Sequence, residues 1–274
     1  MSLARSIALS WLRRPVVHSY GPSRSQVAEL HLPAGPGPHP VAVVLHGGHW
    51  RPKWGKIVTR PISVDLARRG WAAWNVEYRR LGPDGGGWPE TFDDVANAID
   101  HLAALDDPRL DLDRVTVVGH SAGGQLALWA AARPGLPAGA PGSDPKVAVR
   151  QVVALAAVTH LRYAGPVAHV LLGGDPDQVP DRWEQADPIA RVPLGVPVLL
   201  VHPVDDGTVS VRQSRAYAEA AGFAGDDVTL VEPESGGHRA AIHPATPVWQ
   251  AAAGWMEERR SQAASGTSSP VMPP

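Results

Sequence analysis

Short apolar runs rich in β-branched residues alternate with amphipathic helical patterns along most of this 274-residue chain. Runs of this kind suit strands that are buried on both faces of a sheet. The predicted strands are 41–45, 71–76, 115–118, 152–158, 198–201 and 228–231. The predicted helices are 62–69, 91–105, 122–133, 211–221 and 248–259. This alternation predicts an α/β fold, with a mostly parallel twisted sheet and helices on both of its faces.

The distribution of Gly and Pro along the chain predicts a single domain. The 28 Gly and 28 Pro residues fall between the predicted elements and are not gathered in a linker, so we expect one α/β domain over residues 1–260. Residues 161–192 show little periodicity and are expected to form an irregular excursion over the strand ends or a small lid. Residues 261–274 are rich in Ser, Gly and Pro, which predicts a flexible C-terminal tail.

Charge and composition exclude several classes of function. The net charge is −2, and the pI of about 6.6 argues against a nucleic-acid partner, which would require a basic surface. The absence of cysteine excludes disulfides, zinc ribbons, iron–sulfur clusters and a cysteine nucleophile. Residues 1–15 lack the apolar core and cleavage site of a signal peptide, and no apolar run has a membrane-spanning length, so we expect a cytoplasmic protein without a membrane partner.

One short motif points to nucleophilic chemistry. Gly119-His120-Ser121-Ala122-Gly123 fits the pattern G-x-S-x-G, and it lies between the predicted strand 115–118 and the predicted helix 122–133. A serine on such a sharp turn stands at the carboxyl edge of the sheet, and the small flanking residues let the backbone pass close to the helix. Ser121 is therefore the predicted nucleophile.

A serine nucleophile requires a histidine base and a carboxylate that orients it, in the chain order serine, acid, histidine. His238 follows the last predicted strand in the loop Ser235-Gly236-Gly237-His238 and is the predicted base, with His243 as the competitor. Asp205 and Asp206 both follow the strand 198–201, where one carboxylate is needed. The second of the pair would be an exposed turn residue or a helix cap.

A loop rich in small residues predicts the oxyanion hole. Leu45-His46-Gly47-Gly48-His49-Trp50 follows the first strong strand, where backbone N–H groups can stabilise negative charge on the substrate oxygen. The predicted donors are the amides of Gly48, His49 and Ala122.

Together these segments resemble the α/β-hydrolase superfamily over residues 41–258. The H-G-G-x-W form of residues 46–50 is similar to the branch that holds kynurenine formamidase (arylformamidase) and small carboxylesterases, with prolyl-oligopeptidase-like hydrolase domains as neighbours. Family members often read H-G-x-x-D-x-x-V-P followed by Q-S after the acid strand. His202 to Ser210, with Gln213-Ser214, follows this pattern except at Pro203 and Ser210. The resemblance thus implies Asp206 as the acid.

The remaining predictions concern two tryptophans in loops, one ion pair, and metal or cofactor binding. Trp50 and Trp183 lie in loops expected near the strand ends and are predicted to bind an acyl or aryl group. Glu77-Tyr78-Arg79-Arg80 is expected to end a strand with a structural ion pair. The chain contains neither a helical zinc motif nor a phosphate-binding loop, so we expect no metal and no cofactor.

These residues predict a serine hydrolase of the carboxylesterase type that cleaves small acyl or aryl esters through an acyl-enzyme. Two alternatives stay open: an arylformamidase acting on N-formylkynurenine, and a catalytically silent α/β-hydrolase serving as a binding module. The expected partner is a small-molecule ester or formamide, with a homodimer as one option for the oligomeric state.

Overall fold

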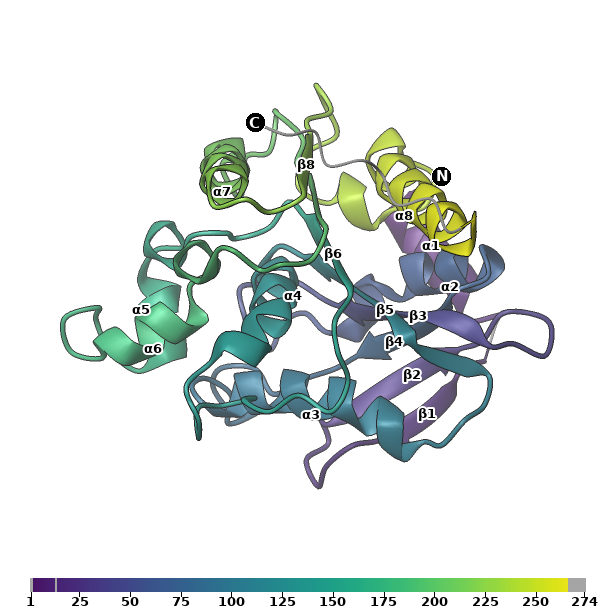
Figure 1. Ribbon diagram of the computed structural model, residues 1–274, viewed down its shortest axis with the longest axis horizontal. Helices are drawn as coiled ribbons and strands as arrows, with labels where there is room; N and C mark the ends of the chain where they lie inside the picture. Colours follow the sequence, from purple (N-terminus) through teal and green to yellow (C-terminus); the bar gives the residue numbers. More distant parts are fainter. Residues whose placement is uncertain (1, 13, 266–274) are drawn as a thin grey trace.

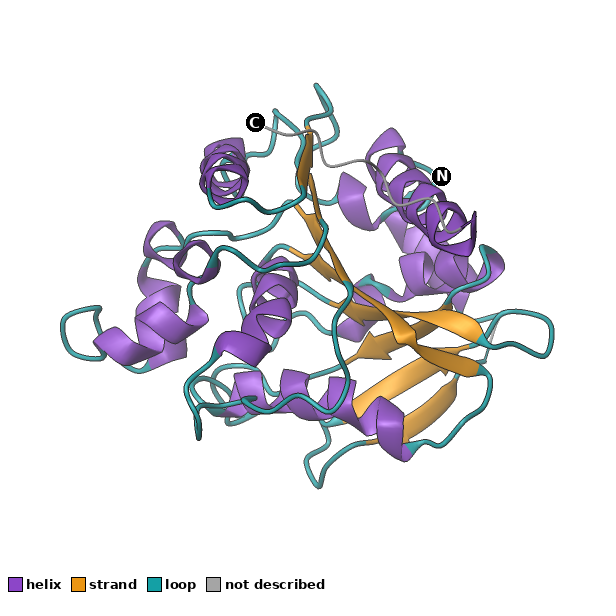
Figure 2. Cartoon of the chain, in the orientation of Figure 1, coloured by secondary structure: helices purple, strands orange, loops and turns teal. Residues whose placement is uncertain are grey.

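In the computed structural model, which describes residues 2–12 and 14–265, an eight-stranded sheet runs through the middle of the molecule (Figure 2). Its order is β1-β2-β4-β3-β5-β6-β7-β8. The strands are β1 (Val16–Ser19), β2 (Val27–His31), β3 (His39–Leu45), β4 (Ala72–Val76), β5 (Leu110–His120), β6 (Gln151–Leu155), β7 (Val198–Val201) and β8 (Val228–Val231). Pairs β1–β2 and β2–β4 are antiparallel, and the others are parallel. This arrangement confirms the predicted mostly parallel sheet.

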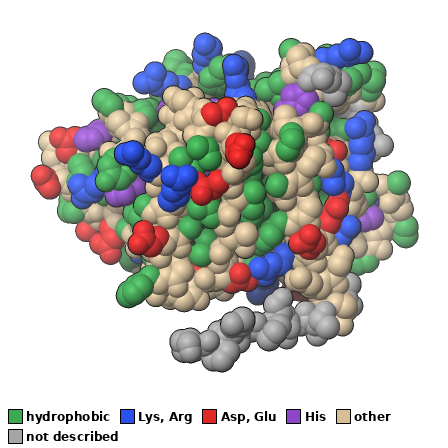
Figure 3. Space-filling view, turned by 90° about the horizontal axis from the view of Figure 1, so that it is seen from above, with side chains coloured by type: hydrophobic (Ala, Val, Ile, Leu, Met, Phe, Trp, Pro, Cys, Tyr) green, Lys and Arg blue, Asp and Glu red, His purple; other side chains and the backbone are tan. Residues whose placement is uncertain are grey.

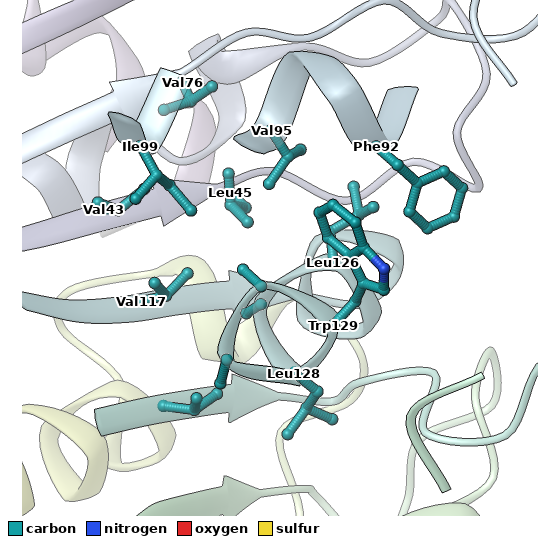
Figure 4. Close-up of a cluster of buried hydrophobic side chains, with 14 of the residues drawn as sticks. Val43, Leu45, Val76, Phe92, Val95, Ile99, Val117, Leu126, Leu128 and Trp129 are labelled. Atoms are coloured by element: carbon teal, nitrogen blue, oxygen red, sulfur yellow. The ribbon is translucent and has the colours of Figure 1, made fainter. Parts of the chain in front are cut away.

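Helices cover both faces of this sheet because alternate residues of each strand point to opposite sides. In β3, Val43 and Leu45 join one core, while Ala42 and Val44 join the other. The first core packs against α3 (Glu90–Ala104) and α4 (Ala122–Ala132), as Figure 4 shows. The second packs against α2 (Arg60–Arg68) and α8 (Pro247–Ser265). Figure 1 shows α8 and α2 on the side of the sheet opposite α3 and α4.

Several elements differ from the expectation. β1, β2 and α1 (Leu3–Ser10) were not predicted, and β6 ends at Leu155, although its apolar run continues to residue 158. The strand stops because Ala156 has a positive φ of 45°, which turns the chain out of the sheet.

The excursion at 161–192 contains two short helices, α5 (Pro166–Leu172) and α6 (Pro180–Ala186). Leu171, Leu172 and Trp183 from these helices are buried in the first core. α7 (Val211–Phe223) packs against β8 and completes this side. Of the predicted tail, residues 261–265 belong to α8, and residues 266–274 lie outside the described part of the chain.

The carboxyl ends of the parallel strands gather at one edge of the sheet, where α/β proteins place their sites. The loops after β3, β5, β7 and β8 carry residues 46–50, Ser121, Asp205-Asp206 and His238. On the face shown in Figure 3, Lys and Arg side chains are interspersed with Asp and Glu side chains. Within residues 2–12 and 14–265, no helix has the length and apolarity required to cross a bilayer.

Candidate active site

Ser121 occupies a strained turn between β5 and α4. Its φ is 56° and its ψ is −119°, a region that side-chain-bearing residues rarely adopt. A Cβ at Gly119 would lie 2.1 Å from the Gly123 carbonyl oxygen, and a Cβ at Gly123 would lie 2.3 Å from the Leu45 carbonyl oxygen. The turn therefore requires glycine at both flanking positions of the motif, as the sequence indicated.

The structure brings Ser121, His238 and Asp206 into one hydrogen-bonded chain. The Ser121 Oγ lies 2.9 Å from His238 Nε2, and His238 Nδ1 lies 2.7 Å from Asp206 Oδ2. The competing His243 lies elsewhere: it is buried, and its Nδ1 accepts a hydrogen bond from the Ala245 amide. With Nδ1–H donating to the carboxylate, Nε2 is left as the acceptor for the serine proton.

The environment of Asp206 keeps this carboxylate charged. Its side chain is 0% exposed, and its Oδ1 accepts hydrogen bonds from the amides of Thr208 and Val209 at 2.7 and 3.1 Å. Burial raises the pKa of Asp206, but hydrogen bonds from His202, His238 and the Thr208 amide lower it by more. The net pKa lies well below the usual range, so Asp206 is an anion at neutral pH.

Asp205 has a different structural role, which the sequence did not reveal. Its carboxylate accepts hydrogen bonds from the amides of Gly236 and Gly237 at 3.1 and 2.8 Å, and these bonds lower its pKa. Because Gly237 precedes His238 directly, Asp205 ties down the loop that carries the histidine. Asp206 thus contacts the imidazole of His238, and Asp205 contacts the loop that carries it.

His120 contacts the backbone of the same loop. Burial and the nearby His238 lower the pKa of His120 to about 3, so its ring is neutral at physiological pH. Its Nε2 lies 2.9 Å from the main-chain oxygen of His238, and the two rings are 4.7 Å apart. His120 therefore positions the backbone of the histidine beside the nucleophile.

The loop after β3 presents unpaired amides to this site. Gly48, His49 and Trp50 all have positive φ, at 125°, 54° and 55°. Among the described residues, the N–H groups of Gly48, His49 and Ala122 have no protein acceptor. Gly48 and His49 also line the same cavity as Ser121. Unpaired N–H groups next to a serine suit an oxyanion hole, and the assignment of Gly48, His49 and Ala122 to this role stays a prediction.

A buried polar network holds this loop in place. His46 Nε2 lies 2.8 Å from Glu77 Oε1, and His46 Nδ1 lies 2.8 Å from the Gly47 carbonyl oxygen. The Tyr78 hydroxyl donates to the His46 carbonyl oxygen at 2.6 Å, and the two rings stack at 4.3 Å. Arg80 lies 3.3 Å from Glu77, which confirms the ion pair expected in this segment.

We expect Glu77→Gln to lower stability in a pH-dependent way. Burial raises the pKa of Glu77, but the charge and hydrogen bond of His46, together with Arg80 and the Lys56 amide, lower it from 4.5 to about 2. That shift corresponds to about 3 kcal/mol of stability. Because the folded-state pKa is lowered, this contribution is complete above pH 4.5 and is lost as the pH falls toward 2.

Urea unfolding at pH 7, 5, 4 and 3 measures this difference, with Glu184→Gln as the control at an exposed glutamate. The gap between wild type and Glu77→Gln should narrow toward acid, while the control stays near wild type throughout. A gap that is the same at every pH would contradict the assigned cause.

The cavity beside Ser121 has a volume of about 640 Å³. Trp54, Val58 and Ile242 give it apolar walls. The predicted substrate-binding residues Trp50 and Trp183 do not line it: their side chains are 1% and 4% exposed and belong to the first core. Burying these large indole rings stabilises the fold.

Two further features bear on what the cavity can bind. His49 is half-buried at its wall, and burial together with the charges of His238 and Arg51 lowers the pKa of His49. No group of three or more His, Cys, Asp or Glu side chains in the described ranges is arranged to hold a metal ion.

Known proteins with related sequences include two from Mycobacterium tuberculosis strain ATCC 25618 / H37Rv. Esterase LipC is 29% identical over 201 residues, covering 66% of this chain and 48% of LipC. The probable carboxylic ester hydrolase LipM is 24% identical over 195 residues, covering 67% of this chain and 45% of LipM. The chain thus spans about half the length of the curated relatives it matches.

Solved structures share the fold. A truncated carbohydrate esterase from gut microbiota superposes with a TM-score of 0.76 at 21% identity, covering 91% of this chain and 96% of that one. Esterase Est2 from Thermogutta terrifontis gives a TM-score of 0.75 at 22% identity, covering 91% and 92%. These likenesses confirm the α/β-hydrolase fold. The sequence model of the BD-FAE family matches residues 29–221, well over half of the chain, and the chain therefore belongs to the BD-FAE family.

Proposed function

We propose that this chain is a carboxylic ester hydrolase that works through a serine acyl-enzyme. The observation that carries the proposal is the hydrogen-bonded chain from Ser121 through His238 to Asp206, which opens into a cavity beside unpaired amides. The names of LipC and LipM, both ester hydrolases, support the same class of reaction.

The geometry supports a two-step reaction. The Ser121 Oγ attacks the ester carbonyl carbon while His238 Nε2 takes the serine proton, and the carbonyl oxygen becomes an oxyanion near the Gly48, His49 and Ala122 amides. Collapse of this intermediate breaks the ester C–O bond, and His238 gives the proton to the leaving alcohol. Water, deprotonated by His238, then attacks the acyl-serine, releases the acid and restores the Ser121 hydroxyl. Asp206 stabilises the imidazolium in both steps.

The cavity favours small acyl or aryl esters. Its volume of about 640 Å³ lies in the usual range for small-molecule sites. T. terrifontis Est2 has been solved with butyrate and with propionate bound, and we propose acyl groups of similar size for this chain. Its apolar walls, including Val58 and Ile242, fit hydrocarbon better than charge.

An arylformamidase acting on N-formylkynurenine is the second candidate, favoured by the H-G-G-x-W form of residues 46–50. The same serine would attack a formamide carbonyl and release an aromatic amine. A silent binding module is disfavoured, because the hydrogen-bonded set at Ser121 is complete.

We expect wild-type kcat/KM to be highest on p-nitrophenyl acetate and butyrate and at least about tenfold lower on octanoate, because added methylenes must fit a cavity of limited size. N-formylkynurenine is assayed in the same panel, and mass spectrometry follows acylation of Ser121. A preference for N-formylkynurenine by orders of magnitude would favour the formamidase, and silence on every substrate would favour the binding module.

A further inference from the structure

The N-terminal helix α1 forms one wall of the cavity at Ser121. Six apolar side chains line that cavity: Leu3, Ala4, Ile7, Trp54, Val58 and Ile242. Three of these belong to α1, and the other three come from distant parts of the chain. The helix therefore supplies half of the apolar side chains that a bound substrate would meet.

The sequence of α1 explains how it presents this wall. Leu3, Ala4 and Ile7 are spaced by one and three residues, so they share one face of the helix. Ser6 and Ser10 are buried on another side of the helix, and small residues of this kind allow a close approach to a neighbouring element. The helix contacts α2 (Figure 1), and Leu9 is 44% exposed. The helix α1 thus faces the cavity on one side, packs against the protein on another, and is exposed to solvent at Leu9.

Contacts at both ends keep α1 in this position. At its start, Leu3 packs against the second core, and the Ser2 side chain caps the first turn of the helix by accepting a hydrogen bond from the Arg5 amide. At its end, the Arg60 guanidinium lies 3.9 Å from the ring centroid of Trp11. The helix is therefore built onto the catalytic face by specific contacts.

We propose that α1 limits the size of the substrate's apolar arm, with Ile7 and Leu3 as the specificity-determining residues. This inference rests on the proposed ester hydrolase function. Ile7 is half-buried, so part of its surface faces space that a hydrocarbon chain can fill. The wall acts on ground-state fit and leaves the bond-making groups at Ser121 untouched.

The apolar arm can be the acyl chain or the alcohol of the ester. The cavity is lined both by Gly48, beside the oxyanion position, and by His238, which protonates the leaving oxygen. The two arms share one chemistry, a hydrocarbon group attached to the ester. Two substrate series distinguish them: p-nitrophenyl esters from acetate to decanoate vary the acyl chain, and alkyl acetates from ethyl to decyl vary the alcohol.

The test compares Ile7→Ala and Ile7→Trp with Leu9→Ala, the same truncation as Ile7→Ala at an exposed position of the same helix. In the acyl series or in the alcohol series, whichever arm faces α1, Ile7→Ala should raise the ratio of long-chain to short-chain kcat/KM by about tenfold. Ile7→Trp should lower the same ratio by about tenfold. These changes are expected when the cavity gains or loses space for methylene groups. Leu9→Ala should keep the wild-type profile in both series.

Turnover of the shortest esters separates this inference from the proposed function. Leu9→Ala should hydrolyse p-nitrophenyl acetate within about twofold of wild type, and thermal unfolding checks that all three variants are folded. If both Ile7 variants are folded and turn over esters, and their ratios of long-chain to short-chain kcat/KM equal that of wild type, the role of α1 is overturned. A wild-type enzyme inactive on every ester would instead overturn the proposed function itself.

Discussion

Replacing Ser121 by alanine is expected to lower kcat on p-nitrophenyl butyrate by about 10⁵- to 10⁶-fold, the loss seen when a serine nucleophile is removed from a comparable triad. The physical reason is that Ser121 Oγ, 2.9 Å from His238 Nε2, is the only nucleophile placed for attack in the proposed mechanism. Without it, no acyl-enzyme forms, and only the binding and polarising effects of the cavity are left. Steady-state kinetics and the mass of the enzyme after mixing with substrate measure both consequences.

The control is Ser261→Ala, the same chemical change on the exposed side of α8. It should keep wild-type kinetics and stability within about 0.5 kcal/mol, as surface substitutions do. Ser121→Ala should unfold at nearly the wild-type temperature, because the backbone is unchanged. Turnover near wild type in Ser121→Ala would refute the serine mechanism.

Asp206→Asn is expected to lower kcat by about 10⁴-fold, the effect of the equivalent change in a serine protease triad. The Asp206 Oδ1 accepts the Thr208 and Val209 amides, so an asparagine oxygen takes that place and turns its NH₂ toward His238 Nδ1. A donor there forces Nδ1 to accept, which puts the proton on Nε2. The imidazole then has no lone pair for the Ser121 hydroxyl.

Asp205→Asn is the matched comparison, since it makes the same change at the neighbouring residue. Its carboxylate accepts hydrogen bonds from the loop amides of Gly236 and Gly237 and does not contact the imidazole of His238. We expect a loss of less than about tenfold, because one asparagine oxygen still accepts an amide hydrogen. Equal losses in the two variants, measured as kcat on the same ester, would remove the distinction between the two aspartates.

The parallel strands were predictable because each is a continuous apolar run buried on both faces of the sheet. β1 and β2 lack that signal. Val16 and Val17 of β1 are exposed, and β2 carries Glu29 and His31, which are buried beside one another and beside Arg60. A strand that buries charged groups or faces solvent at a sheet edge has no apolar pattern to detect.

In the candidate site, too, features set by neighbouring residues were predictable, and features set by distant segments were not. The turn at Ser121 was predictable because five consecutive residues define it. The competing residues, His243 and Asp205, have the same side chains as His238 and Asp206, and the folded chain places them in contact with other groups. Asp206 is 32 positions from His238 in the sequence, and Ser121 is 117.

By itself, the sequence determined the order of the parallel strands and of the helices between them, the strained serine turn and the residue types that meet at the edge of the sheet. These follow from backbone sterics and from the periodicity of apolar side chains, which act over a few residues. Only the tertiary structure decided that Asp205 bonds the loop before His238, that Trp50 and Trp183 are buried in the core, and that α1 forms a wall of the cavity. Those outcomes depend on packing between segments far apart in the chain, where many weak contacts are summed and no local pattern records the result.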